Sequence, residues 1–208
     1  MMLMANKGEA VIIGDKSHYN HYERGGFAAL GSVYPLVLPN ESDGTISFDR
    51  IKYEVPAADD QHIVKVTGCS IESSQNNCGG RAIQPAYISK VKKHLKKHKV
   101  TLHLDGARSW NASLALGMEM KEMVKDFDLV NVCLSKGMGC PMGSMIAGSA
   151  KEMARAKVYR KMLGGAMRQT GIISACALVS LMDWQEKLSV DNANAKFLAE
   201  ELAAIPGV

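Results

Sequence analysis

The stretch Val130-Asn131-Val132-Cys133-Leu134-Ser135-Lys136-Gly137 is the most informative part of this 208-residue sequence. Its first five residues form a nearly continuous apolar run, which is typical of a strand buried on both faces of a parallel sheet. A lysine directly after such a strand is unusual, because burying an unpaired ammonium group costs free energy. Two interpretations are open. Lys136 either points to solvent from a loop or is condensed with an aldehyde as a Schiff base.

A second apolar run, Leu102-His103-Leu104, ends in Asp105, and a helix is expected to begin within two residues. In α/β sheets ligands bind outside the carboxyl ends of the strands, which predicts Asp105 at the functional edge. The alternative is that Asp105 only caps the next helix. Asp105 and Lys136 are 31 residues apart, which fits one helical crossover and one strand, so both are expected at the same edge. A carboxylate for a pyridine nitrogen and a lysine for an aldehyde are the groups that pyridoxal phosphate requires.

Strands and helices alternate along the rest of the chain. This alternation predicts an α/β fold in which helices cover a mostly parallel sheet in three α/β/α layers. Strands are expected at 10–13, 63–67, 100–104, 129–134 and 145–147. Helices are expected at about 22–30, 85–97, 107–116, 150–162, 169–187 and 191–204. The segment 34–60 is predicted to form surface loops and a short helix.

The sequence favours two domains. Residues 1–187 are expected to form a large cofactor-binding domain, and residues 188–208 a linker and the first helix of a small C-terminal domain. Asp191 is predicted to cap that helix and Pro206-Gly207 to end it. Met1 to Asn6 are expected to be the tail of a helix, and a strand is expected after Val208, so both ends are predicted to be cut.

Composition narrows the class of protein. The net charge of +4 is mild, and the lysine-rich stretch 90–99 carries no interleaved aromatic residues, so a solvated helix is favoured over a nucleic-acid surface. His94 and His98 have metal-like spacing but no carboxylate or cysteine beside them on that helix, and no metal is expected. Five cysteines without CxxC spacing favour a reducing compartment, the cytoplasm. No signal peptide or membrane-spanning stretch is expected.

Several segments resemble threonine aldolases of the β-eliminating lyase superfamily, in the expected order and over nearly the whole chain. They are Gly14-Asp15-Lys16-Ser17-His18 with Glu23 and Gly25-Gly26, then His103-Leu104-Asp105-Gly106-Ala107-Arg108 with Asn111-Ala112, then Leu134-Ser135-Lys136-Gly137 with Pro141 and Gly143-Ser144, and finally Arg160-Lys161-Met162 with Gly164-Gly165, Met167-Arg168-Gln169 and Gly171. The resemblance implies a pyridoxal-phosphate enzyme that cleaves threonine or allo-threonine to glycine and acetaldehyde. It also implies a homo-oligomer, a dimer or tetramer, with a small amino acid as substrate.

The resemblance implies three catalytic residues. Lys136 matches the family's Schiff-base lysine, Asp105 the partner of the pyridine nitrogen, and His18 the histidine that stacks on the cofactor ring. Two alternatives stay open. The chain is another pyridoxal-phosphate lyase, for example one that catalyses β-elimination, or it is an inactive truncated isoform or subunit.

Further residues are implied in binding. Arg108 matches an arginine near the cofactor hydroxyl and the substrate carboxylate, while Ser135 and Arg168 match contacts to the cofactor phosphate, Arg168 across a subunit interface. Gln75 stands where the family has a histidine close to the substrate hydroxyl, and glutamine cannot act as a general base. The family's upstream Ser-Gly-Thr phosphate loop has no counterpart here. This chain alone is therefore expected to bind pyridoxal phosphate poorly.

Overall fold

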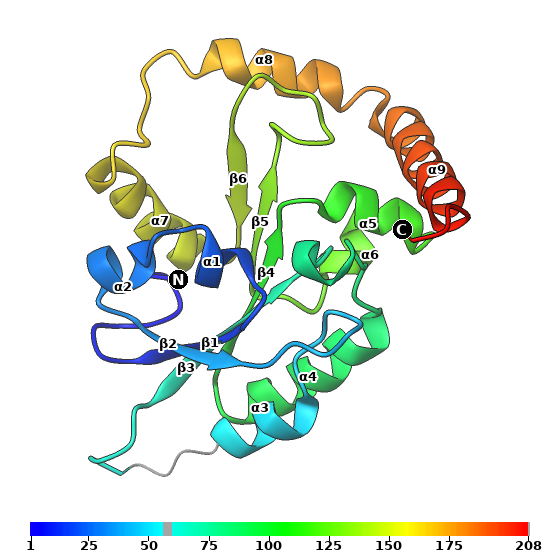
Figure 1. Cartoon of the computed structure of the whole chain (residues 1–208). Coiled ribbons are helices and arrows are strands. Elements are labelled where there is room, and N and C mark those ends of the chain that lie inside the picture. Colours follow the sequence, from blue (N-terminus) through cyan, green and yellow to red (C-terminus); the bar gives the residue numbers. More distant parts are fainter. Residues whose placement is uncertain (56–59, 208) are drawn as a thin grey trace.

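The computed structural model describes residues 1–55 and 60–207, and its centre is a six-stranded sheet with the order β2-β1-β3-β4-β5-β6 (Figure 1). All neighbouring strands pair in parallel except β5 and β6, which are antiparallel. The predicted three-layer α/β fold with a mostly parallel sheet is confirmed. The strands are β1 (Ala10–Gly14), β2 (Tyr34–Leu38), β3 (Val66–Glu72), β4 (Thr101–Gly106), β5 (Leu129–Cys133) and β6 (Ser144–Ala147).

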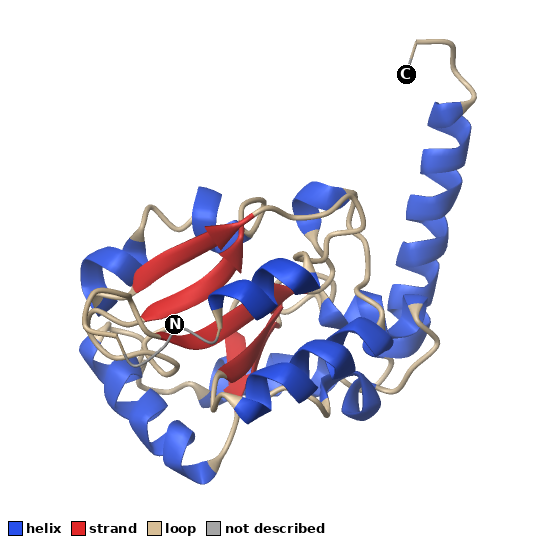
Figure 2. Cartoon of the chain, turned by 90° about the horizontal axis from the view of Figure 1, so that it is seen from below, coloured by secondary structure: helices blue, strands red, loops and turns tan. Residues whose placement is uncertain are grey.

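Helices cover the sheet and extend beyond it (Figure 2). They are α1 (His18–His21), α2 (Gly26–Gly31), α3 (Phe48–Glu54), the 3-10 turn η1 (Asn76–Cys78), α4 (Pro85–Lys97), α5 (Ser109–Ala115), α6 (Met120–Val124), α7 (Ala150–Met162), α8 (Gly171–Ser180) and α9 (Trp184–Ala203). In both views α9 projects away from the sheet. None of the helices in the described part of the chain has the length and apolar character needed to cross a membrane.

The two faces of the sheet carry separate apolar clusters. Alternation along β1 places Ile12 in one cluster, together with side chains of α3 and α4, and places Val11 and Ile13 in the other. Helix α4 shows why its sequence folds this way. Pro85 occupies its first turn, and one stripe of apolar residues is buried while most of its lysines face solvent. The predicted solvated outer helix is thereby confirmed.

A third cluster anchors the segment that follows β5. Leu134, Met138 and Cys140 are buried against Trp184 and Leu188 at the start of α9. The loop that carries Lys136 is therefore held on both sides of the lysine by buried apolar side chains. This anchoring positions Lys136, which is exposed, at the edge of the sheet.

Two predictions for strands need correction. The segment 34–60 was expected to contain loops and one helix, but it begins with β2, an edge strand paired only to β1. Pro35 disfavoured a strand in the sequence, yet an edge strand tolerates proline because one of its sides makes no ladder hydrogen bonds. The strand expected at 63–67 instead runs from Val66 to Glu72. Its polar residues Ser70 and Glu72 belong to a functional edge.

Predictions for helices also differ from the structure. Helix α6 was missed, and the long helix expected at 169–187 ends at Ser180, followed by a new helix at Trp184. Asp191 therefore lies inside α9 and does not cap it. Its carboxylate accepts a hydrogen bond from Asn111 Nδ2 at 3.0 Å. The predicted division into 1–187 and 188–208 stays a prediction, although one continuous helix spans that point. The first residues form a turn, closed by the Met4 amide and the Met1 carbonyl, rather than a helix tail.

Candidate active site

Three polar residues stand side by side at the carboxyl edge of the sheet. Glu72 on β3 pairs in register with Asp105 on β4, and Asp105 pairs with Asn131 on β5. Both carboxylates are buried, at 8% and 7% exposure. Buried carboxylates are rare unless they are hydrogen-bonded or meet a charged partner. This edge is thus a candidate binding site.

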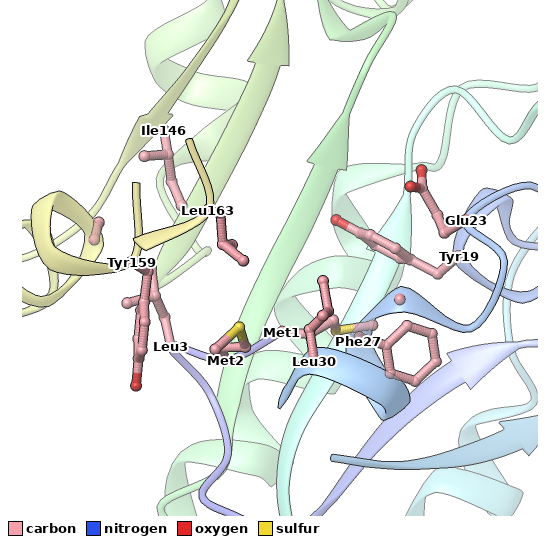
Figure 3. Close-up of a pocket in the computed structure, with 12 residues that line it drawn as sticks. Met1, Met2, Leu3, Tyr19, Glu23, Phe27, Leu30, Ile146, Tyr159 and Leu163 are labelled. Atoms are coloured by element: carbon pink, nitrogen blue, oxygen red, sulfur yellow. The ribbon is translucent and has the colours of Figure 1, made fainter. Parts of the chain in front are cut away.

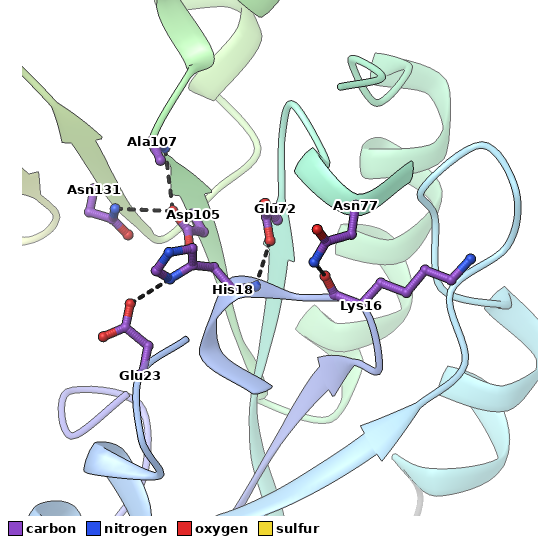
Figure 4. A network of polar contacts seen from close by, with 8 residues as sticks. All are labelled: Lys16, His18, Glu23, Glu72, Asn77, Asp105, Ala107 and Asn131. Carbon is purple, nitrogen blue, oxygen red and sulfur yellow. Dashed lines mark hydrogen bonds and ion pairs between the residues drawn. The ribbon is translucent and has the colours of Figure 1, made fainter. Parts of the chain in front are cut away.

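One of the two carboxylate oxygens of Asp105 is hydrogen-bonded within the protein. Its Oδ1 accepts hydrogen bonds from the Ala107 amide and from Asn131 Nδ2, each at 3.3 Å (Figure 4). Among the described residues no hydrogen bond ends on Oδ2. Burial raises the pKa of Asp105, while these hydrogen bonds and the positive charges of Lys136 and His18 oppose the rise. A ligand with an N–H donor is the partner that such a carboxylate lacks.

His18 is fixed at both its backbone and its ring. Its amide donates to Glu72 Oε2 at 2.9 Å, and its Nδ1 lies 2.6 Å from Glu23 Oε1 (Figure 4). The first contact ties the loop after β1 to the end of β3. The second contact fixes the orientation of the imidazole, which is half-exposed beside Asp105. Part of the ring is therefore accessible to a ligand.

Glu72 is a site residue that was not predicted from the sequence. Its carboxylate accepts the amides of His18 and Asn76, the latter at 3.1 Å. Burial raises the pKa of Glu72 even though these hydrogen bonds favour the ionised form. A usable signal was present in the sequence, because Glu72 ends an apolar strand in the same way as Asp105. The roles of Asn131 and Glu23 were also not predicted. The role of Asn131 depends on a partner distant in the chain, and that of Glu23 depends on the fold of a short loop.

Gln75 does not face the site as predicted. It is 1% exposed, its Nε2 donates to the Lys16 carbonyl at 2.9 Å, and its Oε1 accepts the Cys78 amide at 3.0 Å. Asn77 donates to the same Lys16 carbonyl at 2.8 Å. Gln75 thus holds the loop before His18 against η1. This position does not support a direct contact with substrate.

The structure brings Lys136, Ser135 and Arg108 to the same edge. Lys136 and Ser135 lie exposed in the loop after β5, and the charge of Lys136 opposes the burial that raises the pKa of Asp105. Arg108 precedes the first residue of α5, three residues after Asp105. Arg168 lies in the exposed segment between α7 and α8 and takes no part in this polar network. Its predicted role therefore stays a prediction.

The family model of β-eliminating lyases matches residues 1–208. This chain belongs to the β-eliminating lyase family. A probable low-specificity L-threonine aldolase 2 of Arabidopsis thaliana is 47% identical over 201 residues, which cover 96% of this chain and 56% of the relative. The low specificity L-threonine aldolase of Escherichia coli K12 is 36% identical over 196 residues, 94% of this chain and 58% of the relative.

Solved structures of the family share the fold. A putative L-allo-threonine aldolase of Listeria monocytogenes superimposes with a TM-score of 0.83 and 25% identity, over 95% of this chain and 53% of that one. A threonine aldolase of Leishmania major gives a TM-score of 0.84 at 20% identity, over 98% of this chain and 59% of that one. The chain spans about half the length of the curated relatives it matches.

This family member also has an apolar pocket of about 350 Å³ beside the polar edge (Figure 3). Tyr19 and Glu23 form its wall towards His18, and Phe27, Tyr159 and Leu163 line the rest with other apolar residues. Asp105 and Lys136 do not line it. The residues that line the pocket include no lysine for the aldehyde of a pyridoxal cofactor, so the polar edge remains the candidate active site.

Proposed function

We propose that the protein containing this chain is a pyridoxal-phosphate-dependent aldolase that cleaves L-threonine and L-allo-threonine to glycine and acetaldehyde. The observation that carries the proposal is the convergence of three residues on one edge of the sheet: Asp105 on β4, His18 after β1 and Lys136 after β5. The names of the relatives with 47% and 36% identity support the same reaction.

The side chains at this edge fit the cofactor chemically. Within the described residues no hydrogen bond ends on one oxygen of Asp105, which suits a pyridine N–H, and Lys136 would supply the amine that holds the aldehyde. His18 would lie against the ring, while Ser135 and Arg168 would bind the phosphate. The bound cofactor supplies an electron sink for the electron pair released at the substrate's α-carbon.

The chain's own residues have distinct tasks in this proposal. Asp105 stabilises positive charge on the ring nitrogen, which favours the transition state over the ground state. Arg108 orients the substrate carboxylate. Gln75 is buried and has no proton to exchange near neutral pH, so His18, paired with Glu23, is the group positioned to take the proton from the substrate hydroxyl.

The proposal extends to assembly and location. A dimer or tetramer is proposed, with the segment 161–171 at an interface between copies. A cytoplasmic location is proposed because all five cysteines are unpaired, Cys69 and Cys78 being among the buried ones. An amino acid is the proposed small-molecule partner.

Product analysis tests the reaction. The protein loaded with pyridoxal phosphate is incubated with L-threonine and, in parallel, with L-allo-threonine, and glycine and acetaldehyde are measured. Equal amounts of both products are expected. A keto acid with ammonia would favour the alternative, a β-eliminating lyase. Loaded protein that yields no product would support the second alternative, an inactive isoform, and would refute the aldolase proposal.

A further inference from the structure

A line of buried polar side chains runs beneath the carboxyl edge, on the same side of the sheet as Asp105. Ser70 on β3 and His103 on β4 are register neighbours, 4% and 3% exposed, and Ser70 Oγ lies 2.8 Å from His103 Nδ1. His103 and Asp105 are two residues apart on one strand, so their side chains share a face. Asn131 is the neighbour of Asp105 on β5.

Asn131 has one satisfied end and one unsatisfied end. Its Nδ2 donates to Asp105 Oδ1 at 3.3 Å, which turns its carbonyl oxygen away from Asp105 (Figure 4). That oxygen is buried and has no hydrogen-bond partner among residues 1–55 and 60–207. A buried carbonyl without a donor is costly, so a donor is expected next to it.

His103 is the group that can supply this donor. Burial lowers the pKa of His103 to about 3. The ring is therefore neutral at physiological pH and carries one N–H. If Nδ1 accepts a hydrogen bond from the Ser70 hydroxyl, the N–H of the ring is on Nε2, where it can donate to Asn131.

We propose that Ser70, His103 and Asn131 form a one-way hydrogen-bond chain that ends on Asp105 and fixes the direction of its carboxylate. The Ser70 hydroxyl donates to His103 Nδ1, His103 Nε2–H donates to Asn131 Oδ1, and Asn131 Nδ2 donates to Asp105 Oδ1. The reverse tautomer of His103 would set an imidazole lone pair against the Asn131 oxygen. Only one direction satisfies every buried group.

The chain makes these three side chains positioning residues for Asp105. It holds Oδ1 within the protein and leaves Oδ2 for the cofactor nitrogen, an assignment that rests on the proposed function. Hydrogen bonds in such a chain polarise one another, and the negative carboxylate at its end strengthens each donor. Loss of any member should loosen the carboxylate without removing it.

Histidine ¹⁵N NMR of the cofactor-free protein tests the chain without reference to activity. His103 is expected to be protonated on Nε2 and bare on Nδ1, and to keep this form between about pH 5.5 and 8. Protonation on Nδ1, or titration of His103 in this range, would overturn the proposal. The measurement uses the unaltered protein, so it does not depend on whether a variant folds.

Variants then test the effect on the cofactor. Cofactor affinity is measured from the absorption band of bound pyridoxal phosphate. Asn131→Leu is expected to weaken this binding about tenfold or more. Ser70→Ala is expected to weaken it less and to give a mixture of His103 tautomers. Thr67→Val is the control, because Thr67 is on the same strand as Ser70 and its hydroxyl donates to Glu9, which is not part of the hydrogen-bond chain. It should change neither readout.

The outcomes separate the two proposals. If the unaltered protein fails to bind pyridoxal phosphate while His103 shows the expected tautomer, the proposed function is refuted and the hydrogen-bond chain is supported. If Ser70→Ala leaves both the His103 spectrum and the cofactor affinity unchanged, the hydrogen-bond chain is refuted and the proposed function is unaffected.

Discussion

Asp105 shows at the scale of a single residue how a functional group opposes folding. Its carboxylate is buried, and the net effect of its surroundings raises its pKa, so the ionised form is disfavoured in the folded protein. The hydrogen bonds from Asn131 and Ala107 reduce this cost without removing it. A cofactor cation would offset it. The same residue therefore connects the stability of the cofactor-free protein to its capacity to bind.

Asp105→Asn is expected to stabilise the cofactor-free fold at pH 7 and to reduce aldolase activity by about 10² or more. Because the folded-state pKa lies above the ordinary 3.8, the unfolding free energy of the unaltered protein falls as pH rises from 3.8 through that pKa. The variant lacks this fall. Urea denaturation at about pH 3.5, 5 and 7 measures the difference.

Two results would contradict this expectation. The gain in stability should be largely lost near pH 3.5, where Asp105 is mostly protonated in both the folded and the unfolded states. A gain that is independent of pH would have another origin. The control is Asp49→Asn, because Asp49 is an exposed carboxylate whose pKa is lowered by Lys52. That variant should not gain stability at neutral pH.

Lys136 is expected to carry the cofactor. Borohydride treatment of the protein with pyridoxal phosphate should attach the cofactor to the peptide that contains Lys136, as mass spectrometry can establish. Lys136→Ala should prevent labelling and leave the circular dichroism unchanged, because the side chain is exposed. Lys93→Ala, an exposed lysine of α4, should label normally. Labelling of a lysine in the stretch 90–99 instead would refute the assignment.

At the scale of the element, close strand packing sets the geometry of the edge. Gly106 ends β4 in register with Val132, and a Cβ atom built on it would lie 2.5 Å from the Asn131 carbonyl oxygen. Backbone atoms of a paired strand cannot move aside as a flexible side chain can. Only glycine lets β4 and β5 approach closely enough to place Asp105 beside Asn131.

Gly106→Ala is expected to destabilise the fold by about 1–3 kcal/mol, because the strands must separate. Pyridoxal-phosphate affinity should fall as well, since Asp105 and the Lys136 loop move apart. Urea denaturation and cofactor titration measure the two effects. Gly26→Ala is the matched control, because a Cβ there would meet no atom of the described residues within 4 Å beyond its chain neighbours and its own helix backbone. It should be neutral or stabilising by about 0.4–1 kcal/mol. Equal effects of both substitutions would show that strand spacing is not the cause.

At the scale of the whole molecule, the C-terminal part leaves many large apolar side chains exposed. The exposed residues from α7 onward include Val158, Met162, Leu163, Met167, Ile172, Leu178, Val179, Leu181, Met182, Val190, Phe197, Leu198, Leu202 and Ile205. Exposed apolar surface of this extent is typical of a contact region. It is consistent with the proposed association of copies through the segment 161–171.

The protein is expected to be a dimer or tetramer in light scattering, and Met167→Glu is expected to weaken that assembly. Met167 is 47% exposed in the proposed interface, where a buried carboxylate would be costly. Lys97→Glu, on the exposed face of α4, is the control and should assemble normally. A monomer with full aldolase activity would contradict the proposal.

The sequence by itself determined the α/β alternation and placed Asp105 and Lys136 after buried strands. Both are local properties, because the period of apolar residues and the type of residue that follows a strand can be read within a short window. Because the carboxyl ends of parallel strands lie at the same edge of a sheet, both side chains were expected at that edge. Helix α7 was predicted with its observed bounds, 150–162, for the same reason.

Only the tertiary structure decided which partners complete the site. Glu72 holds the amide of His18 across 54 residues of sequence, and Gln75 is buried against the Lys16 carbonyl instead of facing a substrate. Such contacts depend on strand order and register, which no local pattern contains. A shift of one residue in register would turn Asn131 away from Asp105, because successive side chains of a strand point to opposite faces.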